Sequence, residues 1–167
     1  MRKREGSSPS PRTINEIMMT VIKIQNRKIS GISVRTKNAN ELDASTAKIG
    51  PLWGRFFQAI APSLSQDSSV YGVYYNYESD MNGEFNVLAG ADRLGSTPEM
   101  TMESVTIKEG DYLLFSETGE MPQAVITAWI KVWKYFSSPD CQHKRAYLTD
   151  FEIYRGSDKV EVYIGLK

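Results

Sequence analysis

The sequence predicts an α+β fold built from two copies of a strand-strand-helix-strand-strand unit, and three observations point to it. The 167-residue chain alternates β-prone runs with two helical patterns. Trp53 and Trp129 occupy the same position in these helical patterns, and each is followed after the same interval by an aromatic strand. The closing strand of each half repeats one pattern, FNVLAG in the first half and VEVYIG in the second. We therefore expect pseudo-twofold symmetry, with one antiparallel sheet and one main helix per half.

The first segments of the chain are a polar leader and a pair of strands. Residues 1–12 hold four basic residues, three Ser and two Pro, which is too little apolar surface to pack, so we expect a disordered leader. Residues 18–36 are rich in Ile and Val and predict two strands that turn near residues 26–28. A polar loop over residues 38–46 follows them.

Two amphipathic helices are predicted, one in each half. Over residues 48–64 apolar side chains recur at spacings of three and four, with Pro51 in the first turn and Pro62 at the end. Residues 121–136 show the same spacing. Each helix should therefore place one apolar face on the sheet.

The remaining strands follow in pairs. In the first half, residues 70–78 and 84–93 flank the turn cluster SDMNG. In the second half, residues 102–115 contain two strands that meet at EGD, and residues 146–166 contain two strands around the turn GSD. Each pair predicts a hairpin.

The domain organisation follows from the repeat. We predict a single small-molecule-binding domain over residues 13–167, whose halves cover about 13–95 and 101–167. A chain of this length can bury one sizeable core of that kind. The first half carries extra residues between its opening strands and its helix.

The composition excludes several classes of function. The chain has 20 basic and 20 acidic residues, and four of the basic ones lie in the leader, so the body is mildly acidic, unlike a nucleic-acid-binding protein. The single Cys141 and the single His143 cannot assemble a common zinc or iron site, so we expect no metal, cofactor or catalytic residue. No apolar run is long enough to span a membrane, and the leader lacks the apolar stretch of a signal peptide. We expect a cytoplasmic protein.

Glu152 is the candidate counter-charge for a ligand. It lies among Phe151, Ile153 and Tyr154 in a strand pattern. A carboxylate in such surroundings must have a partner or stay protonated, because burying an unpaired charge is costly. A cation is the obvious partner, and a position on the solvated face of the strand is the alternative.

A groove between two similar halves is a preferred place for a small ligand. Strict alternation over residues 70–78 puts Tyr75 and Tyr77 on one face and Tyr74 on the other. Tyr74 and Phe115 belong to the wider group of groove candidates, and core packing is an alternative for most members of that group. The ligand-binding set that we predict is Glu152, Tyr75, Tyr77, Trp53, Phe57, Tyr112, Trp129, Trp133, Phe151 and Tyr154. Aromatic faces and a carboxylate both favour a cationic ligand.

Four segments together resemble the GyrI-like small-molecule-binding family, which is also the effector-binding domain of AraC-type and multidrug-sensing regulators. They are YGVYYNYESDMNGEFNVLAGAD, VTIKEGDYLLFSETGEMPQAVITAWIKVWKYF, DFEIY and VEVYIG. The resemblance covers roughly residues 14–167 and is greatest to the free-standing integron cassette proteins that bind cationic drugs. It implies a duplicated fold, and it implies that Glu152, the glutamate of DFEIY, pairs with the ligand. Since no helix-turn-helix domain precedes the module in this sequence, we do not expect the DNA-binding role of a regulator.

Three classes of function stay open at this point. The first is a stand-alone module that binds amphipathic cationic aromatic compounds or drugs, as a sensor or a sequestering protein. The second, implied by the resemblance, is a protein-interaction module like the family members that inhibit DNA gyrase. The third is a hydrolase of reactive electrophilic compounds, as in some relatives. We favour the first, with lipophilic cations as partners and a monomer or homodimer as the assembly.

Overall fold

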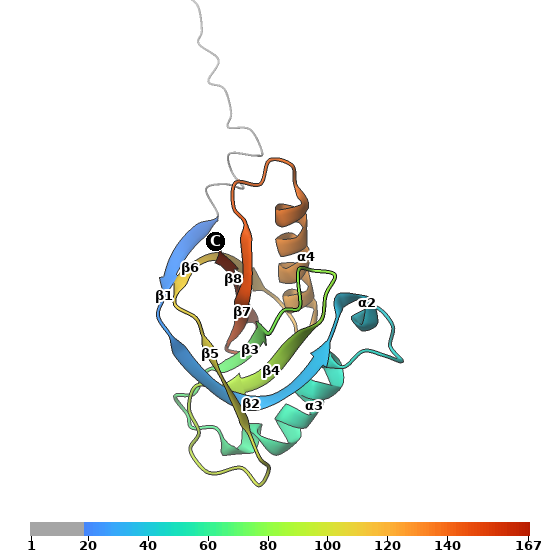
Figure 1. The fold of residues 1–167 in the computed structure, drawn as a ribbon. Helices are drawn as coiled ribbons and strands as arrows, with labels where there is room; N and C mark the ends of the chain where they lie inside the picture. Colours follow the sequence, from blue (N-terminus) through green and yellow to red (C-terminus); the bar gives the residue numbers. More distant parts are fainter. Residues whose placement is uncertain (1–18) are drawn as a thin grey trace, which may run out of the picture.

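The computed structural model describes residues 19–167, and the leader expected over residues 1–12 lies outside the described residues. The strands are β1 (Thr20–Ile24), β2 (Arg27–Thr36), β3 (Val70–Tyr75), β4 (Phe85–Ala91), β5 (Glu103–Ile107), β6 (Gly110–Thr118), β7 (Arg145–Arg155) and β8 (Lys159–Leu166). They form one antiparallel sheet of eight strands in the order β1-β6-β8-β7-β3-β4-β2-β5. The sheet is strongly curved, and β1 runs into β2 as one bent band (Figure 1).

Both main helices expected from the sequence are confirmed. The helices are α2 (Asn38–Glu41), α3 (Ile49–Ala59) and α4 (Gln123–Ser137), with a 3₁₀ turn at Ala61–Ser63. The carboxylate of Glu41 accepts hydrogen bonds from the backbone N–H groups of Lys48 at 3.0 Å and Ile49 at 3.2 Å. The Glu41 carboxylate stabilises the start of α3, because a helix N-terminus carries free N–H groups and partial positive charge. Pro51 fits the first turn for the same reason, since its missing N–H has no partner there.

The strand order confirms the duplicated α+β fold. Read from either end, the sheet presents equivalent strands in the same order, with β1 matching β5, β2 matching β6, β3 matching β7 and β4 matching β8. The two halves meet where β3 pairs with β7 at the centre of the sheet. Pseudo-twofold symmetry therefore places equivalent residues of the two halves on either side of one central line.

The opening strands of each half do not form the hairpins that the sequence predicts. β1 pairs with β6 of the other half, and β5 pairs with β2. Only Gln25 and Asn26 separate β1 from β2, and the chain continues across them into the bent band instead of folding back (Figure 1). This exchange joins the two halves by backbone hydrogen bonds at both edges of the sheet.

Each main helix covers the strands at one side of the sheet and leaves its centre open. α3 packs against β2 and β4, with Leu52 and Phe56 fully buried. α4 packs against β6 and β8, with Ala128 and Val132 fully buried. The central strands β3 and β7 lie between the two helices and present one face to the space there.

The opposite face of the sheet has a separate core, enclosed by the curvature of the sheet and built from strand residues. It contains Tyr71, Tyr112, Phe151 and Tyr163, all buried. The rings of Phe151 and Tyr163 stack with their centroids 4.7 Å apart. Side chains of β3 and β7 therefore alternate between this closed core and the open space between the helices.

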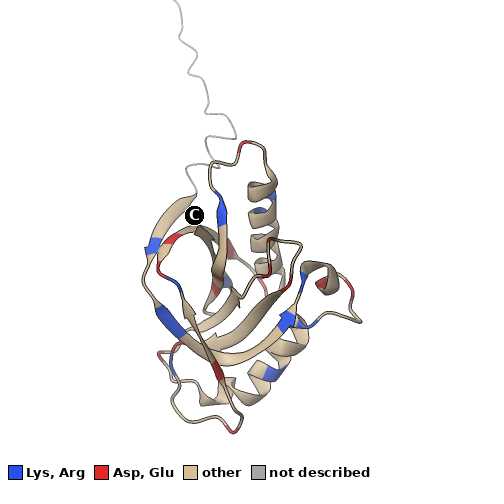
Figure 2. Ribbon diagram, viewed as in Figure 1, with Lys and Arg blue, Asp and Glu red and all other residues tan. Residues whose placement is uncertain are grey.

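Charged residues are dispersed over the part of the chain that the structure describes. In the view of Figure 2, Lys and Arg are spread over β1, β2, the helices and the loops and do not form one stripe. No helix among these residues has the length and apolar character needed to cross a membrane.

Candidate functional site

A cavity lies between α3 and α4, over the central strands β3 and β7. Its volume is about 1050 Å³, enough for a drug-sized ligand. Apart from Glu41, Arg145 and Glu152, its lining residues are uncharged. The aromatic residues that line it are Trp53, Phe57, Tyr74, Tyr77, Phe85, Trp129, Trp133, Tyr147 and Tyr154.

Glu152, in β7, is 1% exposed and receives hydrogen bonds from neutral groups. Trp129 Nε1–H donates to Oε2 at 2.8 Å, and the Tyr154 hydroxyl donates to Oε1 at 3.0 Å. The Tyr74 hydroxyl lies 3.4 Å from both oxygens. No salt bridge found among the described residues involves Glu152. The solvated-face alternative is therefore excluded, and the carboxylate is hydrogen-bonded without a balancing positive charge.

Burial has the largest effect on the ionisation of Glu152. It raises the pKa of this carboxyl from 4.5 to about 7, although the hydrogen bonds from Trp129, Tyr154 and Tyr74 lower it in part. Burial also raises the pKa of both tyrosine hydroxyls, so they keep their protons at neutral pH. Near pH 7 the carboxyl is close to its titration midpoint, and a cation placed beside it would favour the ionised form.

Two other carboxylates near the cavity already have partners. Asp150 is fully buried, and its Oδ2 lies 2.7 Å from Nη2 of Arg145 in a salt bridge. Glu41 accepts hydrogen bonds from the N-terminus of α3. Of these three groups, Glu152 is the one that is fully buried without a positively charged partner.

Gly72 makes room for the Glu152 carboxylate. The two residues pair directly across β3 and β7. A Cβ atom at Gly72 would lie 2.5 Å from Oε1 of Glu152, closer than real Cβ contacts. A glycine inside a strand often marks such a close approach.

We expect Gly72→Ala to displace the Glu152 carboxylate and break its hydrogen bond with Trp129. The Tm should fall and the tryptophan fluorescence should change, because the environment of the indole changes. Gly54→Ala is a matched control, since a Cβ there meets nothing within 4 Å and Ala in a helix is about 0.5–1 kcal/mol better than Gly. Equal losses of Tm in the two variants would contradict a specific clash with Glu152.

The tryptophans of the two halves both line the cavity. Trp129 of α4 has its ring centroid 4.8 Å from that of Tyr74, and Trp53 of α3 lies 5.3 Å from Tyr154. Phe57 and Trp133 lie beside them on the two helices and are 61% and 44% exposed. These two exposed rings lie where the cavity meets solvent.

The structure brings most of the predicted ligand-binding set to this cavity. The members that line it are Glu152, Trp53, Phe57, Tyr77, Trp129, Trp133 and Tyr154. They come from both helices, from the segment after β3 and from β7. The groove expected between the halves therefore corresponds to a cavity with a carboxylate in its floor.

Tyr75, Tyr112 and Phe151 do not reach the cavity, and their predicted place in the groove is corrected. Tyr112 and Phe151 belong to the closed core on the opposite face of the sheet, and Tyr75 is half-buried and packs against that core. Phe151 precedes Glu152 in β7, and neighbours along a strand point to opposite faces. The hydroxyl of Tyr112 lies 2.7 Å from Thr149 Oγ1, so its polar atom has a structural partner.

Tyr77 reaches the cavity although strict alternation places it with Tyr75. Asn76 has a φ of 54°, in the left-handed region, directly after the end of β3. This residue interrupts the alternation, so Tyr74 and Tyr77 line the same cavity. Asn adopts this conformation more readily than most residues. The Asn before Tyr77 was therefore the signal in the sequence that the alternation could be interrupted there.

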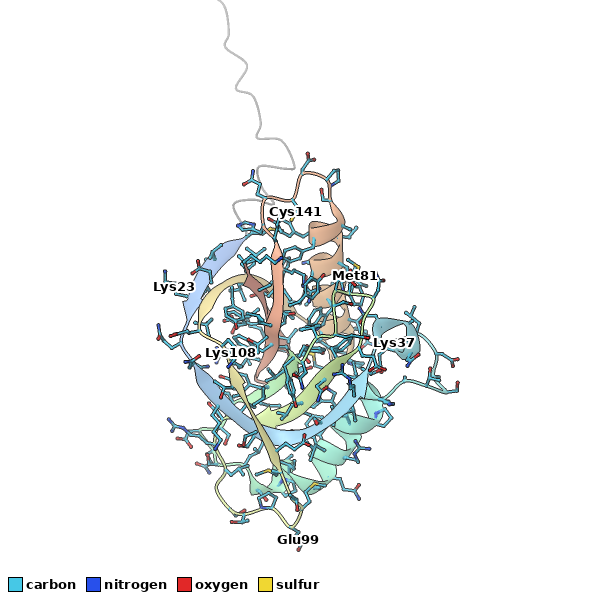
Figure 3. All side chains as sticks on the ribbon, in the orientation of Figure 1. Lys23, Lys37, Met81, Glu99, Lys108 and Cys141 are labelled. Carbon is cyan, nitrogen blue, oxygen red and sulfur yellow. The ribbon has the colours of Figure 1, made fainter. Side chains whose placement is uncertain are left out.

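Sequence reasoning missed Arg145, Tyr147 and Met81, which also line the cavity. Met81 lies in the loop between β3 and β4, on the side of α2 and α4 (Figure 3). Neither Arg145 nor Tyr147 follows from periodicity, because β7 is irregular between Arg145 and Asp150.

The chemistry that the cavity offers is electrostatic and aromatic. In the described part of the chain, no three His, Cys, Asp or Glu residues are grouped as a metal site requires. A carboxylate held by neutral donors and surrounded by aromatic rings favours a cation that also has apolar surface.

Comparison with known proteins places this geometry in context. Residues 20–166 match the family model described as "Cass2: Integron-associated effector binding protein". The crystal structure of integron cassette protein VCH_CASS2, from the mobile metagenome of Vibrio cholerae, is 44% identical in sequence with a TM-score of 0.82. That match covers 89% of this chain and 95% of the cassette protein.

Two more distant proteins are similar to this chain over most of its length. SAV2435, in a structure bound to tetraphenylphosphonium, has a TM-score of 0.64 and 16% identity, over 89% of this chain and 93% of its own, so the fold is shared. YobU of Bacillus subtilis (strain 168), named as a candidate transcriptional regulator, is 26% identical over 156 residues, which are 84% of this chain and 92% of YobU.

Proposed function

The chain belongs to the Cass2 family of integron-associated effector binding proteins, and from this we propose that it binds amphipathic, lipophilic cations with Glu152 as their counter-charge. One observation carries the proposal. Glu152 is a buried carboxylate whose hydrogen-bond donors are all neutral, whereas the nearby Asp150 is paired with Arg145. A bound cation would supply the positive charge that Glu152 lacks.

The cavity wall supports a ligand with large apolar surface. The aromatic rings of α3 and α4 remove the ligand from water, and their faces favour positive charge. In such surroundings an ion pair is screened less than at the protein surface. A cation that brings its own apolar groups also loses less hydration on entry than a compact, strongly hydrated ammonium ion.

The distant neighbour SAV2435 supports the choice of ligand class. It shares the fold, and its structure contains tetraphenylphosphonium, a lipophilic cation. We propose the same class for this chain on the basis of Glu152 and its aromatic surroundings, and we use tetraphenylphosphonium as a probe.

We propose binding without turnover, by a cytoplasmic module that senses or sequesters its ligand without contacting nucleic acid. A hydrolase could use the same carboxylate and tyrosines, so the test must examine the ligand after binding. Incubation of the protein with tetraphenylphosphonium, followed by chromatography, should return the cation unchanged. A gyrase inhibitor would instead reduce DNA supercoiling in the absence of any ligand.

The proposed function is tested with an isosteric pair of ligands at pH 8. (4-Biphenylyl)trimethylammonium and 4-tert-butylbiphenyl have nearly the same shape and differ in charge. We expect the cation to displace a fluorescent lipophilic cation from the protein at least tenfold more effectively than the neutral compound. Equal displacement by the two compounds, or none by the cation, would reject Glu152 as a counter-charge and with it the proposed function.

A further inference from the structure

A second polar group lies on the cavity wall, on the same strand as the counter-charge. Across β7 and β8 the register shifts between Arg145, paired with Leu166, and Asp150, paired with Ile164. In a regular strand, residues five apart lie about 16 Å from each other and on opposite faces. The irregularity in β7 instead brings Nη2 of Arg145 to 2.7 Å from Oδ2 of Asp150.

Asp150 is fully engaged by protein groups. Its Oδ2 accepts hydrogen bonds from Arg145 and from the Tyr77 hydroxyl at 2.6 Å, and its Oδ1 accepts one from the backbone N–H of Gly165 at 2.8 Å. The residue is 0% exposed. Asp150 is thus unavailable to a ligand, and its role is to hold the guanidinium of Arg145 at the cavity wall.

Arg145 has donor capacity that the described residues do not use. Its side chain is 6% exposed, and its Nε is a buried polar atom without a hydrogen-bond partner in the described part of the chain. Arginine carries five N–H donors, and buried donors are nearly always bonded. The ring of Tyr147 lies over the guanidinium, with its centroid 4.4 Å from the central carbon.

Tyr147 makes this part of the wall unusual. Its φ is 52°, a left-handed conformation that non-glycine residues seldom adopt and that is common at ligand sites. The centroid of its ring lies 5.4 Å from that of Tyr77. Both Tyr147 and Arg145 line the cavity. The irregular segment of β7 therefore presents the Arg145 guanidinium and the Tyr147 ring to the cavity, beside the Tyr77 ring from the segment after β3.

We propose that this part of the cavity is a second subsite, in which the Arg145 guanidinium donates hydrogen bonds to an oxygen acceptor of the ligand, such as a carboxylate, while Glu152 takes the cationic group. The inference rests on the proposed function and narrows its ligand class to lipophilic cations that carry an acceptor at their other end. The Tyr147 ring shifts to admit the acceptor.

Two matched probes test the subsite: pentyltriphenylphosphonium and (4-carboxybutyl)triphenylphosphonium. They share the cation and the chain length and differ in a terminal carboxylate. Without a partner, the carboxylate weakens binding to an apolar cavity, because it loses its hydration. With Arg145 as partner, we expect the carboxylate probe to bind the natural sequence at least fivefold more tightly than the pentyl probe at pH 8.

The variant for this test removes both charges of the ion pair. Arg145→Met alone would leave Asp150 buried and unpaired, which is strongly destabilising. The double variant Arg145→Met/Asp150→Asn avoids an uncompensated charge. The readout is the ratio of the two affinities in one protein preparation, which a partial loss of folded protein does not change. We expect the preference to reverse, so that the pentyl probe binds more tightly.

Each outcome decides between the two proposals. The subsite is overturned if the natural sequence shows no preference for the carboxylate probe, or if the double variant keeps that preference. Should the pentyl probe bind and lose affinity in Glu152→Gln while no carboxylate preference is seen, the subsite falls and the proposed function stands. If neither probe binds, the proposed function falls and the subsite falls with it.

Discussion

Replacing Glu152 with Gln should weaken the binding of tetraphenylphosphonium at pH 8 by at least about thirtyfold, which corresponds to about 2 kcal/mol. Gln has nearly the same shape and can still accept the hydrogen bond from Trp129 Nε1. The loss therefore reports the missing negative charge and not a collapsed cavity. Isothermal titration calorimetry measures both affinities directly.

Two controls separate this effect from a general one. Binding of the neutral 4-tert-butylbiphenyl should change by less than threefold in Glu152→Gln. Glu109→Gln removes an exposed carboxylate in the turn between β5 and β6 and should leave cation affinity unaltered. If the cation and the neutral ligand lose affinity equally in Glu152→Gln, the carboxylate does not act through its charge.

Stability should fall as the pH rises from 5 to 8, and Glu152 should account for the fall. Its pKa is about 7 in the folded protein and ordinarily 4.5, so between these values the folded state holds a proton that the unfolded state has lost. A raised carboxyl pKa stabilises the folded state below about pH 4.5, and this contribution is lost as the pH rises through 7. Between pH values well below 4.5 and well above 7, this contribution to the free energy of unfolding changes by about 3 kcal/mol.

Glu152→Gln should remove this dependence, because a neutral amide does not titrate. Denaturant unfolding at several pH values should show the variant gaining stability over the natural sequence as the pH rises, by up to about 3 kcal/mol at pH 8. A constant difference between pH 5 and 8 would mean that the carboxyl does not titrate in this range.

Cation affinity should rise with pH, whereas stability should fall. A cation binds the ionised carboxylate, so below about pH 7 binding must first remove the proton and affinity falls about tenfold per unit. The two tyrosine hydroxyls that face the carboxyl do not titrate there, because burial raises the pKa of Tyr74 and of Tyr154 above its ordinary value. Titrations in buffers of different ionisation enthalpy should detect release of a proton at pH 6 and little release at pH 8.5.

The fold could be predicted from the sequence to a large extent. Helical spacing around Trp53 and Trp129 and the repeated strand patterns were enough for the duplicated α+β architecture, because local periodicity determines both. The pairing of β1 with β6 and of β5 with β2 could not be predicted. It depends on whether the chain turns back or continues at residues 25–26, and a two-residue connection permits either course.

The site was predictable where it follows from alternation along one strand. Glu152 and Tyr154 share a face of β7 for this reason, and the same rule should have placed Phe151 on the other face. Gly72, inside the aromatic run YGVYYNY, was a signal of close approach that points to a bulky neighbour. The contribution of Arg145 could not be predicted, because it depends on an irregularity in β7 that only its pairing with β8 reveals.

The central claim, that Glu152 is the counter-charge for a bound lipophilic cation, is tested most directly by a crystal structure with tetraphenylarsonium at pH 8. Arsenic scatters anomalously, so its position identifies the centre of the cation without reference to the shape of the ligand density. We predict an anomalous peak inside the cavity between α3 and α4, beside the carboxylate of Glu152 and the ring of Trp129. A peak on the outer surface, or a cation in the cavity with its centre turned away from Glu152, would contradict the claim.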